Sequence, residues 1–471
     1  MHTGDEYFDS QEFLSILEQY KENPSSLDAD DLTDIADYYS FLNERNEALS
    51  AVQLASRMYP GALAPLSFLA REALYDKNIE EAKRIIGQVE DKSDIGYKLF
   101  AVEILIANDD IDEAEYQLNL LLDDIDEDRY DDFIIDVVNI YMDHNVPAKA
   151  EQWLLKNSTC QKAEYKELRA KVLLATGKIG ESKAIFNELL DKDPFSIKYW
   201  NALATSQFLT GEYENSINSC DFALAIDPDN IDGLFTKGNC LYHMGKYEEA
   251  LVCYRRYLTL EPKDELGYLN SGTCLLNLAR YEESINLLKK ALDVITGESD
   301  QLTMIYQELS HAYCAIKDWD EALSCISKAE KISPDAPDIL VLKGHILLCK
   351  GQVKEAMAIF SDVSYHYHND INVMIHIVSS VCENGYSLLA YNMFKTLIDK
   401  SWPESKYGNS YMALCCNDLG KVDEFLYYLE QATKRNPHEA QMILGNIFPP
   451  DLEPKDYLSF AKKQIENNKN E

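Results

Sequence analysis

Basic residues are scarce in this chain relative to acidic ones. Its 471 residues hold 44 Lys and Arg against 81 Asp and Glu, which gives a formal net charge of −37 at pH 7. A surface with this balance repels a phosphate backbone and lacks the cations on which non-specific nucleic-acid affinity depends. We therefore expect no nucleic-acid partner. Hydrophobic residues still make up 46% of the chain, so the acidity is expected to be a solvated surface on a folded protein.

Long apolar runs and an N-terminal export signal are also lacking. No stretch approaches the roughly 18 to 20 apolar residues that a membrane-spanning helix needs, and residues 1–10 carry acidic side chains where a secretory signal has a basic stretch and an apolar core. The 11 cysteines begin only at Cys160, which is not the dense framework of a small secreted domain. These features predict a soluble cytoplasmic protein with reduced thiols and no membrane insertion.

Motifs for catalysis or metal binding are missing as well. The chain contains no GxGxxG, GxxxxGK[ST], HExxH or GxSxG pattern. His366, His368 and Asp370 could form a ligand cluster, but a polar loop is the alternative that we favour, because positions i and i+2 do not share a helical face. The acidic run at residues 123–132 lacks the turn glycine and terminal glutamate of an EF-hand and is read as a solvated turn between repeats. We expect no enzyme activity, no cofactor and no metal.

What the chain does contain is a repeat of about 34 residues. Gly211, Tyr213, Ser216 and Pro228 return as a second set 34 residues later, namely Gly245, Tyr247, Ala250 and Pro262. Each period holds two stretches of about 12 residues with apolar side chains at the i, i+3, i+4 spacing of one helical face. Each unit is therefore predicted to be an antiparallel pair of helices.

Small and special residues have separate roles in the predicted pair. A turn glycine ends the first helix in a left-handed conformation without a Cβ penalty; these are Gly177, Gly211, Gly245, Gly351, Gly385 and Gly420. Small residues let the two helices approach; these are Ala204, Gly238, Gly272 and Gly344 on first helices, and Ala250, Ala322, Ala356 and Ala390 on second helices. Tyr254, Phe360 and Phe394 are expected to fill the space between repeats. A proline ends each unit, as at Pro60, Pro194, Pro228, Pro262, Pro334 and Pro437.

This pattern resembles the tetratricopeptide repeat (TPR), in which Trp, Leu, Gly, Tyr, Ala, Phe and Pro recur along 34 residues. Trp200, Leu203, Gly211, Ala223 and Pro228 match it, whereas Gln207 and Cys220 stand at its Tyr and Phe positions. Twelve units can be phased, starting near Ala29, Leu63, Ile95, Asp131, Ala163, Ile197, Ile231, Glu265, Thr303, Pro337, Ile371 and Lys406. The resemblance implies an all-α fold, a right-handed superhelical solenoid of about 12 antiparallel helix pairs.

The predicted organisation has four parts. An N-terminal capping helix occupies residues 1–28, degenerate acidic units occupy 29–162, clearer units occupy 163–439, and a C-terminal capping helix and tail occupy 440–471. An insert near residues 294–302 lengthens one connection. A solenoid needs such polar-faced ends, and no stretch is long enough for a second globular domain.

The resemblance also implies a binding surface. First helices line the concave groove of a TPR superhelix, and the corresponding positions here are Asn201, Thr205, Phe208, Phe235, Asn239, Tyr242, His243, Asn270, Thr273, Asn277, Gln307, His311 and His345. Amides can pair with the backbone of an extended peptide and aromatic rings can accept its apolar side chains. For Phe208, Phe235 and Tyr242, packing between repeats is the alternative. Some TPR domains clamp a chaperone's C-terminal carboxylate; Asn239 and Asn270 match that clamp, but Phe235, Met304 and Glu308 replace its cations.

These observations favour a non-enzymatic scaffold that binds a protein segment or peptide in its groove. The alternative is a peptide-sensing regulator whose superhelix tightens on ligand binding. Self-association through an exposed end stays open. Residues 1–132 carry 33 acidic and only 10 basic side chains, an asymmetry that either steers a basic partner or keeps an extended surface soluble.

Overall fold

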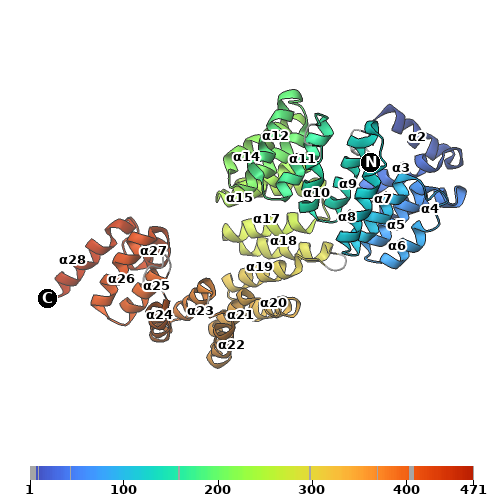
Figure 1. Ribbon diagram of the computed structural model, residues 1–471. Helices are drawn as coiled ribbons and strands as arrows, with labels where there is room; N and C mark the ends of the chain where they lie inside the picture. Colours follow the sequence, from blue (N-terminus) through green and yellow to red (C-terminus); the bar gives the residue numbers. More distant parts are fainter. Residues whose placement is uncertain are drawn as a thin grey trace. The chain divides into compact units, whose positions relative to one another are not determined.

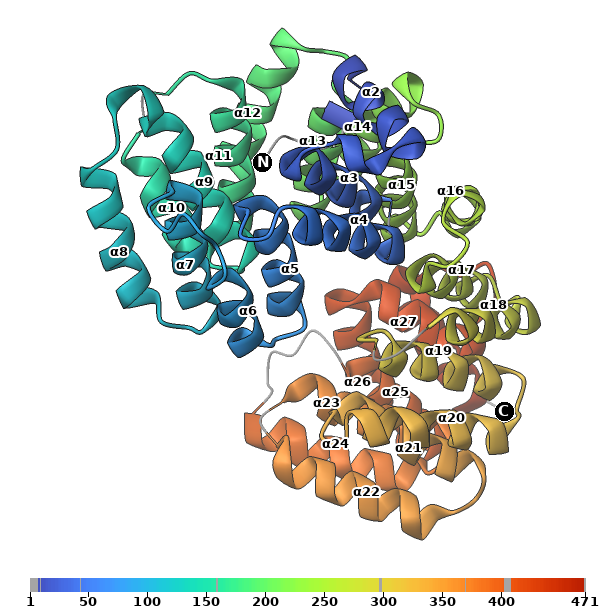
Figure 2. The ribbon, with the colours of Figure 1, turned by 90° about the vertical axis from the view of Figure 1, so that its right-hand side faces the viewer.

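The computed structural model describes residues 7–8, 10–42, 44–157, 160–295, 299–368, 370–401 and 408–469. These residues form helices joined by short turns, without a strand among them. Packing divides the chain into two compact units, Met1–Ile226 and Asp227–Glu471. Within each unit, the helices pack in consecutive pairs (Figures 1 and 2).

The N-terminal unit begins with a short capping segment followed by six helix pairs. The first helices are α3 (Ala29–Phe41), α5 (Leu63–Tyr75), α7 (Ile95–Ala107), α9 (Tyr130–Asp143), α11 (Ala163–Ala175) and α13 (Ile197–Leu209). Their partners are α4 (Arg45–Met58), α6 (Ile79–Ile86), α8 (Ile111–Asp123), α10 (Pro147–Leu155), α12 (Ile179–Lys192) and α14 (Tyr213–Ile226). Helix α2 (Gln11–Glu22) precedes them, and the short 3₁₀ turns η1 (Pro24–Ser26) and η2 (Glu127–Arg129) lie in connections.

The C-terminal unit has six further pairs. Their first helices are α15 (Ile231–His243), α17 (Glu265–Asn277), α19 (Leu302–Ala315), α21 (Pro337–Cys349), α23 (Ile371–Glu383) and α25 (Asn409–Asp418). Their partners are α16 (Tyr247–Leu260), α18 (Tyr281–Val294), α20 (Trp319–Ile332), α22 (Val353–His366), α24 (Ser387–Ser401) and α26 (Val422–Arg435). The unit ends with α27 (Pro437–Leu444), η3 (Gly445–Ile447), η4 (Pro454–Asp456) and α28 (Tyr457–Lys469). The predicted all-α array of antiparallel helix pairs is confirmed.

The helix boundaries follow the sequence signals. Helices α12, α14, α16 and α20 all end two residues before a proline, as expected from the residues at 194, 228, 262 and 334. Several first helices begin at a side-chain cap: the carboxylate of Asp28 accepts from the backbone N–H of Asp31 at 2.9 Å, and Asn230 accepts from Gly233 at 2.7 Å. Such caps satisfy N–H groups that a helix leaves open at its start. One phased start, Lys406, lies outside the described residues, as does part of the insert near 294–302.

The turn between the two helices of a pair is left-handed. All six predicted turn glycines have positive φ, from +67° at Gly420 to +83° at Gly385. Five units without a turn glycine adopt the same conformation with another residue, at Lys77, Asp109, Asn145, Ala279 and Lys317, with φ between 56° and 63°. The geometry of the pair therefore prevails over the usual steric preference of these residues.

Close contact between the paired helices depends on small residues, as predicted. A Cβ placed on Gly344 would lie 2.3 Å from Cε1 of Phe360, and one on Gly238 would lie 2.6 Å from Cε1 of Tyr254. Each of these two rings therefore packs directly against the glycine of the first helix in its own pair. In other pairs, a serine of the second helix donates to a backbone carbonyl of the first, as Ser216 does to Ala204 at 2.7 Å.

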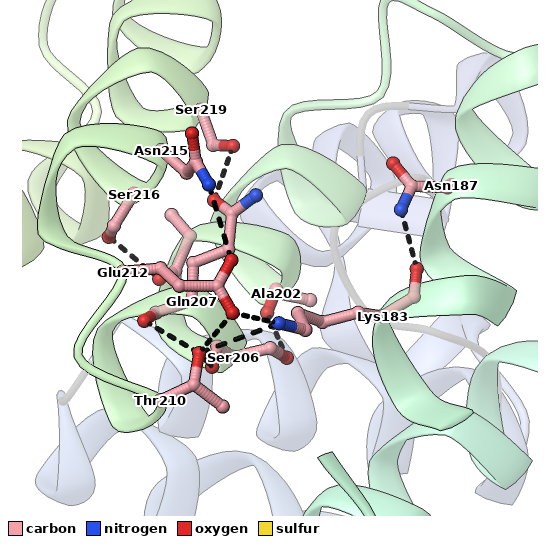
Figure 3. A network of polar contacts seen from close by, with 11 residues as sticks. Lys183, Asn187, Ala202, Ser206, Gln207, Thr210, Glu212, Asn215, Ser216 and Ser219 are labelled. Carbon is pink, nitrogen blue, oxygen red and sulfur yellow. Dashed lines mark hydrogen bonds and ion pairs between the residues drawn. The ribbon is translucent and has the colours of Figure 1, made fainter. Parts of the chain in front are cut away.

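Polar side chains replace consensus contacts in the pair formed by α13 and α14 (Figure 3). The hydroxyl of Ser219 donates to Oε1 of Gln207 at 2.8 Å, which satisfies the amide that stands at the TPR tyrosine position. Glu212, in the turn, pairs with Lys183 of α12 and accepts from Thr210 at 2.9 Å and Asn215 at 3.2 Å. These contacts join three consecutive helices of the N-terminal unit.

Successive first helices also pack directly on one another, for example α3 on α5, α5 on α7 and α7 on α9, and likewise α21 on α23. First helices of one unit therefore share a surface. No helix in the described part of the chain is long and apolar enough to cross a membrane.

Candidate functional site: an amide-lined and histidine-lined surface

The C-terminal unit places its share of the predicted groove residues on the first helices α15, α17, α19 and α21. Those residues are Phe235, Asn239, Tyr242 and His243 on α15, Asn270, Thr273 and Asn277 on α17, Gln307 and His311 on α19, and His345 on α21. The contacts below show which of them the fold brings together. Their role in binding stays a prediction.

Asn239 and Asn270 form a hydrogen-bonded pair across two repeats. The amide Nδ2 of Asn270 donates to Oδ1 of Asn239 at 3.3 Å, and the hydroxyl of Tyr254 donates to the same oxygen at 2.7 Å. Tyr254 is itself 1% exposed, so the core holds the pair in place. This arrangement leaves donor hydrogens on Asn239 and the acceptor oxygen of Asn270 on the half-buried surface. We call these two residues the amide pair.

A second contact links the same helices further along. Nδ2 of Asn277 lies 3.4 Å from the hydroxyl of Tyr242 and donates to the carbonyl of Thr273 at 2.9 Å. The ring of Tyr242 packs edge-on against Tyr247 at 5.4 Å. Asn277 and His243 are exposed. Polar groups therefore continue along α15 and α17 beyond the amide pair.

Phe235 packs inside its own repeat. Its ring lies 5.0 Å from that of Tyr257 and 5.9 Å from that of Tyr254, both on α16. These contacts fit the packing alternative, although Phe235 remains half-buried. The amide pair rests on the same Tyr254, so Phe235 supports the pair indirectly.

A cavity of about 490 Å³ lies on α19, α21 and α23. It is lined by Gln307, His311, Cys314, Asp338, Val341, Leu342, His345, His376, Ser379, Ser380 and Glu383. All of these residues come from first helices. Three predicted residues, Gln307, His311 and His345, are thus brought together, while the prediction missed the contribution of α23.

The surrounding protein lowers the pKa of the two predicted histidines of this cavity. Removal of water by surrounding protein lowers the pKa of His311, with His345 adding to the effect, and the same desolvation lowers the pKa of His345. Nδ1 of His345 lies 3.4 Å from the amide of Asn384. A neutral imidazole both donates and accepts a hydrogen bond, and the carboxylates of Asp338 and Glu383 line the same cavity, so it offers both donors and acceptors to polar groups of a ligand.

The remaining predicted residues belong to the N-terminal unit, on α13. Thr205 donates to the carbonyl of Asn201 within the helix at 3.0 Å, and the ring of Phe208 lies 5.9 Å from that of Tyr213. All three side chains are partly buried. Their contacts lie within α13 and with α14, and their role in binding stays a prediction.

Comparison with known families agrees with the geometry. Three models described as "Tetratricopeptide repeat" match residues 168–231, 231–264 and 267–295. No curated protein matches the chain. Among solved structures, a TPR protein from Parabacteroides merdae is 16% identical, covers 55% of this chain and 100% of its own, with a TM-score of 0.46.

Two further structures are similar at the same level. Yeast Tom70 is 15% identical, with 93% of this chain and 96% of that chain covered and a TM-score of 0.45. The type IV pilus biogenesis factor PilW is 17% identical, with 46% and 98% covered and a TM-score of 0.42. The family models match the middle of the chain, and helix pairs of the same design lie on either side of it. The middle of the chain, from residue 168 to residue 295, therefore consists of tetratricopeptide repeats within a longer array of paired helices.

Proposed function

We propose that this chain is a non-enzymatic scaffold that holds an extended protein segment against the amide pair and the neighbouring polar surface of α15 and α17. The observation that carries this proposal is the fixed orientation of Asn239 and Asn270. Tyr254 and Asn270 both donate to Oδ1 of Asn239. The amide pair therefore offers donor hydrogens and an acceptor oxygen side by side.

A peptide backbone presents the complementary groups. Each residue carries one carbonyl acceptor and one N–H donor, and an extended segment exposes them at regular spacing. Because the amide pair is pre-oriented by the buried Tyr254, little side-chain entropy is lost when it binds. The histidine-lined cavity on α19, α21 and α23 would then accept polar side chains of a segment that continues along the first helices.

The test uses the full-length protein and random peptides displayed on phage. Peptides are selected on the wild-type protein, and their dissociation constants are measured for wild type, for Asn239→Ala with Asn270→Ala, and for a control, Asn286→Ala with Asn392→Ala. The control removes two exposed amides from the second helices α18 and α24. Circular dichroism verifies that each variant is folded.

The proposal predicts a loss of affinity of at least about ten-fold for the amide-pair variant and an unchanged dissociation constant for the control. Equal affinity for all three proteins would contradict it. The absence of catalysis and a cytoplasmic location belong to the same proposal. The 11 cysteines are thiols and not disulfides in the structure, a state that a reducing compartment maintains.

A further inference from the structure

A second concave surface lies in the N-terminal unit, on α3, α5, α7 and α9. It contains two adjoining cavities of about 600 and 540 Å³, which share Asp30, Arg71, Glu103 and Asp143 among their lining residues. Volumes of this size are typical of ligand-binding clefts and far exceed the space of a single ion. We call this surface the acidic groove.

The acidic groove combines carboxylates with apolar walls. Its carboxylates come from α3 (Asp30, Asp34, Asp37), α5 (Glu72), α7 and its cap (Asp94, Glu103) and α9 (Asp136, Asp143). Rings of Phe8, Phe68 and Tyr75 line the first cavity, and Tyr75 is 75% exposed. Exposed aromatic surface beside charge of one sign is typical of a protein-binding site.

The one guanidinium of the acidic groove is already engaged. Arg71 donates from Nε and Nη2 to the carboxylate of Glu103 at 3.2 to 3.3 Å, and the ring of Phe100 lies 5.4 Å below it. Glu103 has a second partner in His144 at 3.5 Å, and its side chain is 6% exposed. Arg71 therefore neutralises the buried Glu103, and Arg45 of α4 pairs with Glu72 at 2.9 Å.

Four groove carboxylates, Asp30, Asp37, Asp136 and Asp143, have no cationic side chain within 4 Å in the described part of the chain. All four residues are exposed to solvent and line the groove. Loss of water raises the pKa of all four, to about 6 for Asp37, with neighbouring carboxylates adding to the effect.

Outside the groove, several acidic residues of the same unit form ion pairs with Lys or Arg. On second helices, Glu80 pairs with Lys83 at 3.0 Å, Glu81 with Arg84, and Glu115 with Lys149 at 3.7 Å. These three ion pairs lie outside the groove, whereas Asp30, Asp37, Asp136 and Asp143 inside it have no such partner in the described part of the chain. Such a groove is complementary to positive charge that comes from elsewhere.

Two observations define the class of that ligand. The described residues contain no group of three His, Cys, Asp or Glu side chains placed to hold a metal ion, which disfavours a divalent cation. The apolar walls disfavour a purely hydrophilic polycation, since Phe68 and Tyr75 would then bind nothing. We propose that the acidic groove docks an extended protein segment in which Lys or Arg residues alternate with apolar ones. This site is independent of the amide pair: it offers carboxylates and aromatic rings, whereas the amide pair offers neutral amide groups.

The experiment uses the full-length protein and a fluorescein-labelled synthetic peptide of alternating Arg and Leu, with binding followed by fluorescence anisotropy. The groove variant is Asp37→Asn, Asp136→Asn and Asp143→Asn. The control variant is Asp112→Asn, Asp123→Asn and Asp124→Asn, which removes the same charge from exposed positions on and after α8. Asparagine has nearly the same shape as aspartate, and removing the repulsion between neighbouring carboxylates stabilises the groove variant. If the triple variant does not fold, the single variant Asp143→Asn is used in its place.

The proposal predicts that the groove variant binds the Arg-Leu peptide at least about ten-fold more weakly, whereas the control changes by less than about two-fold. A peptide of alternating Arg and Ser should bind wild type at least about ten-fold more weakly, because it leaves the aromatic wall uncovered. Equal losses in both variants, or equal binding of the two peptides, would overturn the proposal in favour of general charge attraction. Displacement of the peptide by stoichiometric Ca²⁺ would overturn it in favour of an ion site.

The same measurement separates this inference from the proposed function. Asn239→Ala with Asn270→Ala should bind the Arg-Leu peptide as wild type does. Conversely, the groove variant should retain full affinity for peptides selected on the amide pair. If the prediction for one site is wrong, the prediction for the other site can therefore still be tested.

Discussion

Asn270 donates a hydrogen bond to Asn239 from the next repeat, at 3.3 Å, and the buried hydroxyl of Tyr254 donates to the same oxygen at 2.7 Å. Two residues that the sequence places 31 positions apart thus form one preoriented unit. Its orientation depends on Tyr254, whose ring in turn occupies the space left by Gly238. The proposed binding surface and the contact that packs the paired helices together are therefore linked through a single side chain.

The first prediction concerns that hydroxyl. Tyr254→Phe keeps the ring and removes a donor from Oδ1 of Asn239, so it should lower the free energy of unfolding by about 1 kcal/mol. Urea denaturation followed by circular dichroism measures the change. Tyr268→Phe is the control, because its hydroxyl donates to Pro262 at the exposed surface at 3.2 Å; a change within about 0.5 kcal/mol is expected there. Equal changes in the free energy of unfolding for the two substitutions would show that the buried hydrogen bond contributes no more to stability than the exposed one.

The second prediction tests the close approach of paired helices. Gly344→Ala places a methyl group 2.3 Å from the ring of Phe360 and should destabilise the protein by about 2 kcal/mol. Gly180→Ala is the matched control, because Gly180 lies in α12 with no atom within 4 Å of a new Cβ. Helix propensity alone should stabilise that variant by up to about 1 kcal/mol. Thermal unfolding measures the melting temperatures of both variants, which should shift in opposite directions. A shift of both melting temperatures in the same direction would contradict the packing argument.

The third prediction concerns a left-handed turn without glycine. Ala279 has φ of 56°, a conformation that costs an L-residue roughly 1 to 2 kcal/mol. Ala279→Gly removes this strain but adds chain entropy to the unfolded state, so a net stabilisation of about 0.5 to 1 kcal/mol is expected. Ala225→Gly, at an exposed position of the right-handed helix α14, should instead cost about 1 kcal/mol. If Ala279→Gly destabilises as well, the turn is not strained.

The fourth prediction is a dependence of stability on pH in the acidic groove. Loss of hydration inside the groove raises the pKa of Asp37 from 3.8 to about 6, and the negative charge of Asp34 adds to this effect. A carboxyl group with a raised pKa in the folded state binds its proton more tightly there than in the unfolded chain, so its ionisation destabilises the fold as pH rises from about 4 to above 6.

Asp37→Asn should therefore stabilise the protein at pH 8 and have little effect at pH 4. The gain should stay below about 1 kcal/mol, because the carboxylate is partly open to solvent and screened. Melting temperatures at the two pH values measure it. Asp112→Asn, at an exposed site, should show no such difference between pH 4 and pH 8, and an equal gain at both values for Asp37→Asn would contradict the assignment.

Much of the fold could be predicted from the sequence, because the repeat has strong local signals. Predicted unit starts such as Ala29, Leu63 and Ile197 coincide with the first residues of α3, α5 and α13. The left-handed turns at Lys77 and Ala279 could not be predicted, since one strained residue leaves no pattern. Helix α27 was missed because its eight residues are too short for a clear apolar period. The division into parts at residues 28, 162 and 439 stays a prediction.

The candidate sites were only partly visible in the sequence. The family positions gave Asn239 and Asn270, but the bond between them depends on the stacking of two repeats. Ser379 and Glu383 of the histidine-lined cavity hold the ninth and thirteenth positions of their unit and could have been found by extending the same rule to α23. In the N-terminal unit, charge counting showed an acidic excess, but it could not show that Asp37 and Asp143, more than 100 residues apart, line one cavity.

The central claim is that the amide pair binds the backbone of an extended segment, and a double-mutant cycle between protein and ligand tests it most directly. A selected peptide is synthesised with each amide in turn replaced by an ester, which removes one N–H donor, and each ester is measured against wild type and Asn270→Ala. The account predicts one ester position that weakens binding to wild type about ten-fold but does not weaken binding to the variant, a coupling energy of at least about 1 kcal/mol. Coupling energies near zero at every position would contradict the claim.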